Sequence, residues 1–153
     1  MIERILTAAA AAVLTLGAAT TALAEGASPG PLVLAASNAT TNELLVLDTA
    51  GKILHRIPTQ GQGGVSGNAG GIAASRDRVA VVNFGSANVS IFARDDGGRR
   101  FRLERVIPTL GSPVSVAFAN DHLYVLTTTH VESHRAGPRG VAPGVDGQAQ
   151  LLH

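Results

Sequence analysis

The stretch RVAVVNFGSANVSIF, residues 78–92, decides the fold. Residues 79–82 and 89–92 are two short runs of mostly apolar side chains, and both are rich in β-branched residues. The segment between them contains Asn and Gly, which adopt the backbone conformations that reverse a chain at little steric cost. Two such runs on either side of a short turn predict an antiparallel hairpin.

The same pattern precedes this stretch. An apolar run at 32–36 leads through turn residues 38–42 to a second apolar run at 43–48. A turn at 50–52 then leads to a third run at 53–57, which Pro58 ends. Short strands at this spacing predict an antiparallel meander.

These two regions align as repeats. A shift of 46 residues matches Val33 with Val79, Ala36 with Val82, Asn42 with Asn88 and Val46 with Phe92, and a shift of 50 matches 57–59 with 107–109. A third copy begins at 115–126, which matches 71–82 with a shift of 44. From Thr127 onward we expect a loop, because Gly and Pro recur, and we expect 148–153 to begin a further strand. The third copy is therefore predicted to be unfinished.

Tandem units of 40–50 residues with four strands each are typical of β-propeller blades. We predict an all-β chain, a partial β-propeller of about two to three four-stranded antiparallel blades. The blade units are expected at about 32–67, 68–112 and 113–153, and the Gly-rich segment 61–71 is expected to connect the first two. Because four to eight blades close a ring, the chain is expected to be a truncated product or to complete its ring with other copies.

The first 24 residues resemble an export signal. Residues 5–24 carry no charge and end in Ala22-Leu23-Ala24, where small residues suit a signal peptidase. We predict a signal peptide at 1–24, a flexible lead-in at 25–31, and a bacterial protein of the periplasm or the extracellular space. The alternative is a membrane anchor, because 20 uncharged residues could span a bilayer. After cleavage we expect no stable membrane span.

Composition limits the function. The chain has no Cys and no Trp among 153 residues, and its formal net charge is +1. Thiolate chemistry is therefore excluded, and no strong field or stacking platform favours nucleic acid. We expect no cofactor.

Residues 79–92 and the Pro-containing entry 111–118 resemble the blades of lactonase-like seven-bladed propellers, a group that includes propeller-type 6-phosphogluconolactonase, and of YVTN-type repeat proteins. The resemblance covers about residues 32–126. It implies a propeller fold, and it implies lactone hydrolysis only as one activity of the group. It assigns no catalytic residue to this chain, so the catalytic residues are predicted as unknown.

His130, Glu132 and His134 form the first candidate site. On an extended strand alternate residues share a face, so two imidazoles and a carboxylate could hold a divalent metal. The Gly-Pro residues that follow favour a polar loop instead, and we predict no metal site.

The other candidates also have structural interpretations. The segment 61–71 lacks the Lys-Ser/Thr ending of a phosphate-binding loop. A basic cluster, which could bind an anion, is predicted to be a solvated outer strand; it comprises Arg99, Arg100, Arg102 and Arg105. Asn38 and Asn88 begin glycosylation sequons that a bacterial protein would leave unmodified. The isolated His55, His122 and His153 are predicted to be surface or turn residues.

Three functions stay open. The first is an exported binding or scaffold module with a small-molecule or protein ligand. The second is a lactonase-like hydrolase acting on a small sugar lactone. The third is a non-functional truncated product.

Overall fold

The computed structural model describes residues 30–64, 70–95 and 97–152. The predicted signal peptide, most of the predicted lead-in and His153 lie outside the described residues. Within the described residues the chain forms β-strands and one short 3₁₀ turn, so the all-β prediction is confirmed.

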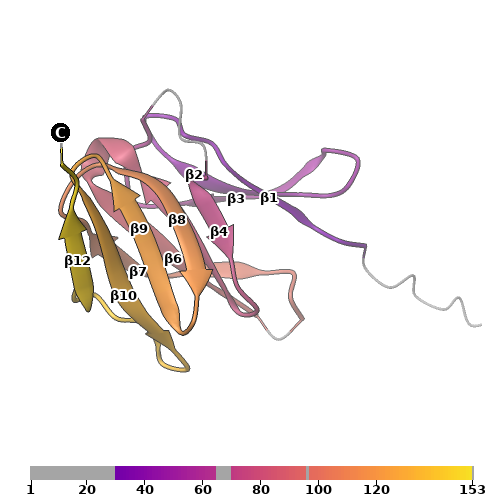
Figure 1. Cartoon of the computed structure of the whole chain (residues 1–153). Coiled ribbons are helices and arrows are strands. Elements are labelled where there is room, and N and C mark those ends of the chain that lie inside the picture. Colours follow the sequence, from indigo (N-terminus) through magenta and orange to yellow (C-terminus); the bar gives the residue numbers. More distant parts are fainter. Residues whose placement is uncertain (1–29, 65–69, 96, 153) are drawn as a thin grey trace, which may run out of the picture.

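The strands form three antiparallel sheets, which follow one another along the chain (Figure 1). Sheet 1 contains β1 (Val33–Ala36), β2 (Glu43–Leu47) and β3 (Ile53–Pro58). Sheet 2 contains β4 (Ile72–Ala74), β5 (Arg78–Asn83), β6 (Asn88–Arg94) and β7 (Phe101–Pro108), with the 3₁₀ turn Phe84–Ser86 between β5 and β6. Sheet 3 contains β8 (Pro113–Ala119), β9 (His122–Thr127), β10 (His130–Gly137), β11 (Gly140–Val141) and β12 (Gly147–Gln150).

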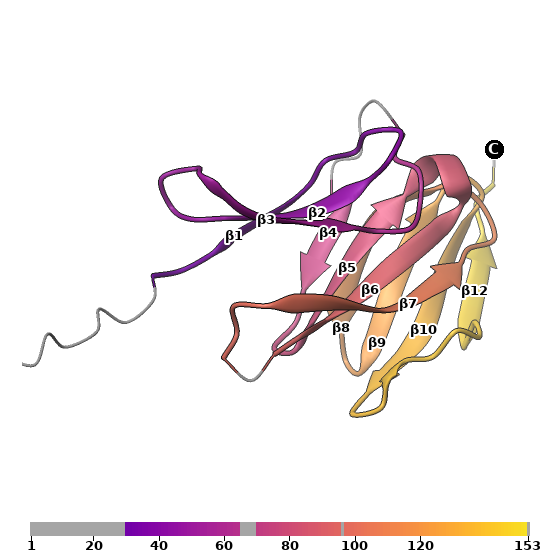
Figure 2. The ribbon, with the colours of Figure 1, turned by 180° about the vertical axis from the view of Figure 1, so that it is seen from behind.

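The sheets lie face to face, with sheet 2 in the middle (Figures 1 and 2). Strands β5 and β6 are apolar on both faces because both are covered, and the alternation of their side chains supplies two separate cores. One core joins sheets 1 and 2 through Leu44, Val46, Val79, Val81, Phe92 and Phe101. The other joins sheets 2 and 3 through Ala80, Val82, Val89, Ile91, Ile107, Val116, Leu123, Val125 and Val141.

The sequence alignment of the first two repeats is wrong by one residue in their second strands. Glu43 pairs with Pro58 and Asn88 pairs with Pro108, so β2 corresponds to β6 with a shift of 45, not 46. The strands before them keep the shift of 46. The paired residues Ala36 and Leu44 are eight positions apart, whereas the equivalent pair Val82 and Val89 is seven apart. Since one residue changes the face, Val46 corresponds to Ile91 and not to Phe92.

The expectation that strand structure ends at Thr127 is also wrong. Residues 130–137 form β10, which pairs with β9 on one side and with β11 and β12 on the other. The Gly-Pro residues that suggested a loop form only the turn after this strand. The segment expected to begin a further strand does so: residues 147–150 form β12, which pairs with β10 in sheet 3. Sheet 1 has fewer strands than expected, because its described residues form three strands and not the four predicted for a blade.

A buried polar joint links sheets 1 and 2 through the side-chain amide of Asn83. Its Oδ1 accepts hydrogen bonds from Asn42 Nδ2 (2.9 Å) and Thr59 Oγ1 (2.7 Å) of sheet 1 and the segment after it. Its Nδ2 donates to Asn88 Oδ1 (2.7 Å) and Ser90 Oγ (2.8 Å) of sheet 2. All four bonding positions of this amide are therefore used, as a buried polar group requires.

Candidate functional site

The structure brings Glu132 and His134 into the interface between sheets 2 and 3, where both are almost fully buried. Both Glu132 carboxylate oxygens face the Leu110 N–H at 3.4 Å. His134 donates from Nδ1 to the Gly144 carbonyl at 3.2 Å, and its buried Nε2 has no hydrogen-bond partner among the described residues. His130 contacts Thr129 Oγ1 at 2.8 Å. In the described part of the chain no group of three or more His, Asp or Glu is placed to hold a metal.

The Gly-rich connector packs on the neighbouring hairpin turns. A Cβ at Gly61 would overlap the Asn83 side chain, and a Cβ at Gly63 would overlap the backbone at Asn38. The Gly63 N–H donates to the Ala39 carbonyl at 2.8 Å, and the Gly64 N–H donates to Asn38 Oδ1 at 2.7 Å. These described N–H groups are used within the protein and do not point at a phosphate. The remaining connector residues, 65–69, lie outside the described residues.

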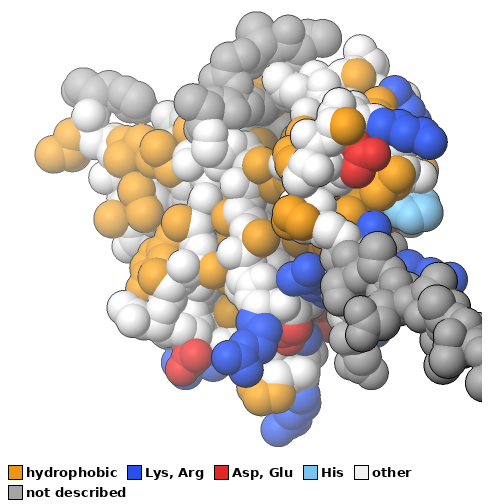
Figure 3. All heavy atoms as spheres, turned by 90° about the vertical axis from the view of Figure 1, so that its right-hand side faces the viewer, with side chains coloured by type: hydrophobic (Ala, Val, Ile, Leu, Met, Phe, Trp, Pro, Cys, Tyr) orange, Lys and Arg blue, Asp and Glu red, His pale blue; other side chains and the backbone are white. Residues whose placement is uncertain are grey.

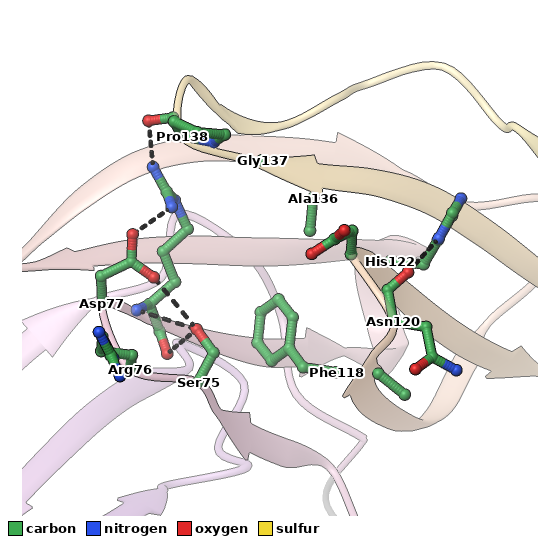
Figure 4. Close-up of a pocket in the computed structure, with 12 residues that line it drawn as sticks. Ser75, Arg76, Asp77, Phe118, Asn120, His122, Ala136, Gly137 and Pro138 are labelled. Atoms are coloured by element: carbon green, nitrogen blue, oxygen red, sulfur yellow. Dashed lines mark hydrogen bonds and ion pairs between the residues drawn. The ribbon is translucent and has the colours of Figure 1, made fainter.

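A groove of about 680 Å³ lies at the end of sheets 2 and 3 that is away from the Gly-rich connector; we call it the turn groove (Figure 4). Its walls are the β4–β5 turn, the β8–β9 turn and the β10–β11 hairpin. Figure 4 shows the Phe118 ring lying between Ser75 on one side and Asn120 and His122 on the other. The groove therefore combines an apolar floor with polar walls.

Arg78 is fixed at one end of the turn groove. Its Nε donates to Glu104 at 2.9 Å, and its Nη1 donates to Asp77. The hydrogen bond to Glu104 is the main cause that holds the pKa of Arg78 above its usual range. Its Nη2 also donates to the Pro138 carbonyl at 3.4 Å, so this cation ties sheet 2 to the β10–β11 hairpin.

His122 occupies the other end of the turn groove. Its Nδ1 donates to the Asn120 carbonyl at 2.8 Å, and its Nε2 lies 2.9 Å from Asp146 Oδ2. The bond to the Asn120 carbonyl, followed by that to Asp146, raises the pKa of His122. The hydrogen bond from His122 and the charge of Arg135 lower the pKa of Asp146. Since acceptors occupy both ring nitrogens, His122 has no free nitrogen to take a proton from a water molecule.

A second groove of about 410 Å³ lies beside the same hairpin; we call it the arginine groove. Arg105 of β7, Arg135 of β10 and Arg139 of the hairpin turn line it, and its lining contains no acidic side chain. Arg135 contacts Asp146 at 3.2 Å, but Asp146 is shared with His122. The carboxylate of Glu104 lies beside Gly140 and is engaged by Arg78. The arginine groove therefore keeps uncompensated positive charge.

The predicted basic cluster is divided by the structure. Arg105 lines the arginine groove, whereas Arg99 donates to the Gly30 carbonyl at 2.9 Å. Arg100 and Arg102 are exposed, as expected for an outer strand. His55 is exposed on β3, while His122 is not isolated, contrary to the prediction.

Sequence reasoning named Arg105 and His122 but missed the other charged groups around the two grooves, Arg78, Glu104, Arg135, Arg139 and Asp146. One signal was present in the alignment, because Arg76-Asp77-Arg78 matches Asn120-Asp121-His122 at the shift of 44. Both segments reach from a turn into the following strand, and both place a basic residue at the start of that strand. Their partners Glu104 and Asp146 follow 26 and 24 residues later, and local sequence does not indicate them.

Comparison with known proteins supports the fold. No protein-family model matches the chain, and no curated protein sequence matches it. Among solved structures the chain is similar to a luciferin-regenerating enzyme, a β-propeller, with a TM-score of 0.52 and 14% identity. The match covers 84% of this chain and 40% of that structure. The chain thus has a β-propeller-type fold and spans less than half of this neighbour. No helix among the described residues is long and apolar enough to cross a membrane.

Proposed function

We propose that the chain is an exported β-propeller-type binding module that holds a small, multiply charged oxyanion in the arginine groove. One observation carries this proposal: three arginines from separate segments line one groove that contains no acid. Guanidinium groups bind carboxylate and phosphate oxygens through paired hydrogen bonds, which makes arginine suited to such ligands. The groove volume lies in the range of small-molecule sites.

The turn groove serves a different purpose in this proposal. Its two basic side chains, Arg78 and His122, are already bonded to Asp77, Glu104 and Asp146. The bond from Arg78 Nη2 to the Pro138 carbonyl ties the hairpin that carries Arg139 to sheet 2. Arg105 and Arg139 form no hydrogen bond or ion pair with the described residues, so both remain available to a ligand.

The test is a titration with inorganic phosphate and with citrate, at constant ionic strength set with chloride, followed by calorimetry. We expect saturable binding, and we expect Arg139→Gln or Arg105→Gln to weaken it about 10- to 150-fold, because a charge-assisted hydrogen bond contributes about 1.5–3 kcal/mol. Arg102→Gln is the matched control, because it removes the same charge from the same strand outside the groove. Equal weakening by all three variants would refute a defined site.

A lactonase-like hydrolase is the second candidate. The resemblance of residues 79–92 to lactonase-like blades and the similarity to a solved enzyme favour it. The bonded state of His122 does not favour it, because water activation needs an unoccupied base. Hydrolysis of any member of a sugar-lactone panel above the uncatalysed rate would establish this function instead.

Export is proposed from residues 5–24. N-terminal sequencing of protein recovered from the periplasm or the medium of a bacterial host tests it. The expected first residue is Glu25, and recovery of uncleaved chain from the membrane fraction alone would contradict it.

A further inference from the structure

The carboxylate of Asp146 connects a residue of the turn groove with a residue of the arginine groove. His122 lines the first groove and Arg135 lines the second, and the two residues pair across from each other in β9 and β10. His122 Nε2 lies 2.9 Å from Asp146 Oδ2, and Arg135 Nη2 lies 3.2 Å from the same oxygen. The two basic side chains therefore share one negative charge.

Only a doubly protonated ring satisfies both contacts of His122. Its Nδ1 faces the Asn120 carbonyl at 2.8 Å and its Nε2 faces Asp146, so both ring nitrogens meet acceptors. A neutral imidazole has a single N–H, and its other nitrogen would present a lone pair to an acceptor. Loss of the proton must therefore weaken one of the two contacts.

The contact with Asp146 is the one that is more easily released. The Asn120 carbonyl belongs to the tight β8–β9 turn, and the next residue, Asp121, accepts a hydrogen bond from the Ala136 N–H at 2.7 Å. The Asp146 side chain is 39% exposed, and Arg135 stays beside it as a second cation. When His122 is neutral, the charge of Asp146 consequently acts on Arg135 alone.

The charged and titratable groups around His122 come from several elements. They are Asp121 and Tyr124 on its own hairpin, Arg135 on β10, Asp146 before β12, and Arg76, Asp77 and Arg78 across the turn groove. The Asn120 carbonyl and then Asp146 raise the pKa of His122, whereas burial and Arg135 lower it, and the net direction is upward. Among these residue types only histidine ordinarily changes charge near neutral pH.

We propose that the proton on His122 controls how tightly the arginine groove holds its oxyanion, through the carboxylate that His122 shares with Arg135. This inference rests on the proposed function of that groove. With His122 charged, two cations balance Asp146, and Arg135 keeps positive charge for the ligand. With His122 neutral, Asp146 compensates Arg135 and the groove attracts an anion less. Binding is therefore tighter at low pH, and by linkage a bound oxyanion holds the proton on His122 more tightly.

Charges elsewhere on the molecule provide a control. Figure 3 shows the side of the molecule that is on the right in Figure 1, where the acidic side chains lie beside basic ones and hydrophobic side chains lie between the charged groups. His55 of β3 is exposed, and its side chain forms no hydrogen bond or ion pair with the described residues. His55→Gln therefore removes a titrating imidazole without changing the shared carboxylate.

Sulfate is the probe for the test, because its charge stays constant across the neutral range, whereas the charges of phosphate and citrate change. Calorimetric titrations are run at about pH 5.5 and about pH 8.5, on either side of the ordinary pKa of histidine, at one ionic strength set with chloride. The wild-type chain and His55→Gln are expected to bind sulfate about fivefold more tightly at the lower pH, which is the low end of typical coupling between two sites.

Two variants separate the coupling from a general loss of structure, because they are expected to act in opposite directions. His122→Gln should bind sulfate at both pH values as weakly as the wild-type chain does at the higher pH. Asp146→Asn should bind it at both pH values as tightly as the wild-type chain does at the lower pH, because Arg135 is then never compensated. In nuclear magnetic resonance titrations, saturating sulfate should raise the proton affinity of His122 by the same fivefold factor of about five.

The outcomes distinguish this inference from the function on which it rests. Sulfate binding of equal affinity at both pH values, an unchanged pH dependence in His122→Gln, or a His122 pKa that sulfate does not move would overturn the coupling and leave the arginine groove as a binding site. No sulfate binding at either pH would refute the proposed function, and the coupling with it.

Discussion

Asn83→Ala is expected to destabilise the molecule more than any other single polar substitution at the joint between sheets 1 and 2. The side chain forms four hydrogen bonds of 2.7–2.9 Å, two to each side of the joint. A buried neutral hydrogen bond contributes about 0.5–1.5 kcal/mol net. Asn42 Nδ2 keeps the Val82 carbonyl as acceptor, and Thr59 Oγ1 keeps the Asn42 carbonyl, so these two partners are not left unsatisfied. The free energy of unfolding should therefore fall by about 2–4 kcal/mol.

Urea unfolding followed by circular dichroism measures this loss. The midpoint should fall while the denaturant slope stays constant, because the same surface is exposed on unfolding. Asn88→Ala is the control. It removes one of the four bonds of Asn83 and the two bonds from Asn88 Nδ2 to Ser86, which are less buried, so it should cost less, about 1–2 kcal/mol. A loss below about 0.5 kcal/mol for Asn83→Ala, or an equal loss for Asn88→Ala, would refute the role given to this amide.

Three further predictions concern the turn groove, the connector and the third sheet. The pKa of His122 is raised and that of Asp146 is lowered, so their pair stabilises the fold most between about pH 4 and pH 6.5 and loses its effect as the pH rises through the raised value or falls through the lowered one. Asp146→Asn should lower the melting temperature most inside that window and less above it, where the ion pair of Asp146 with Arg135 remains; a pH-independent difference would contradict the pairing with His122. Gly63→Ala should lower the free energy of unfolding in urea by about 1–3 kcal/mol, because the added Cβ would overlap the backbone at Asn38. Gly144→Ala is the control and should be nearly neutral, because its Cβ would have no atom within 4 Å. Equal effects would count against tight packing of the connector. His134→Phe should raise the free energy of unfolding by about 1 kcal/mol, because it removes the buried His134 Nε2, which has no partner among the described residues. Phe is also the residue at the equivalent position of sheet 2, Phe92. A loss of stability in calorimetry would show that the bond to the Gly144 carbonyl matters more.

The strands of sheets 1 and 2 could be predicted because their evidence is local. Each hairpin joins two apolar runs through a short turn, as at 79–92, and neighbouring strands then pair without long-range information. The sequence was a poorer guide to the face of the sheet on which each side chain lies. The spacing from Ala36 to its partner Leu44 is one residue greater than the spacing from Val82 to its partner Val89. That single residue moves Val46 from the position of Phe92 to that of Ile91.

The strands at the end of sheet 3 could not be predicted, because local sequence does not indicate them. β10 contains Glu132 and His134 at buried positions, so its sequence lacks the apolar alternation of the other strands. Its partner β12 follows after a long connection, and that pairing is non-local. The candidate site depends on similar long-range contacts. Arg105, Arg135 and Arg139 are separated by up to 34 residues and meet only because β7 lies against the outer edge of sheet 3.

Methyl-labelled NMR gives the most direct test of three stacked sheets with two separate cores. Nuclear Overhauser contacts are expected between Leu44 or Val46 and Val81, and between Val82 or Ile91 and Val125. None is expected between Leu44 or Val46 and Val125, because sheet 2 lies between them. Direct contacts between these last residues would show one continuous core, as in a closed barrel, and would contradict the β-propeller-type arrangement.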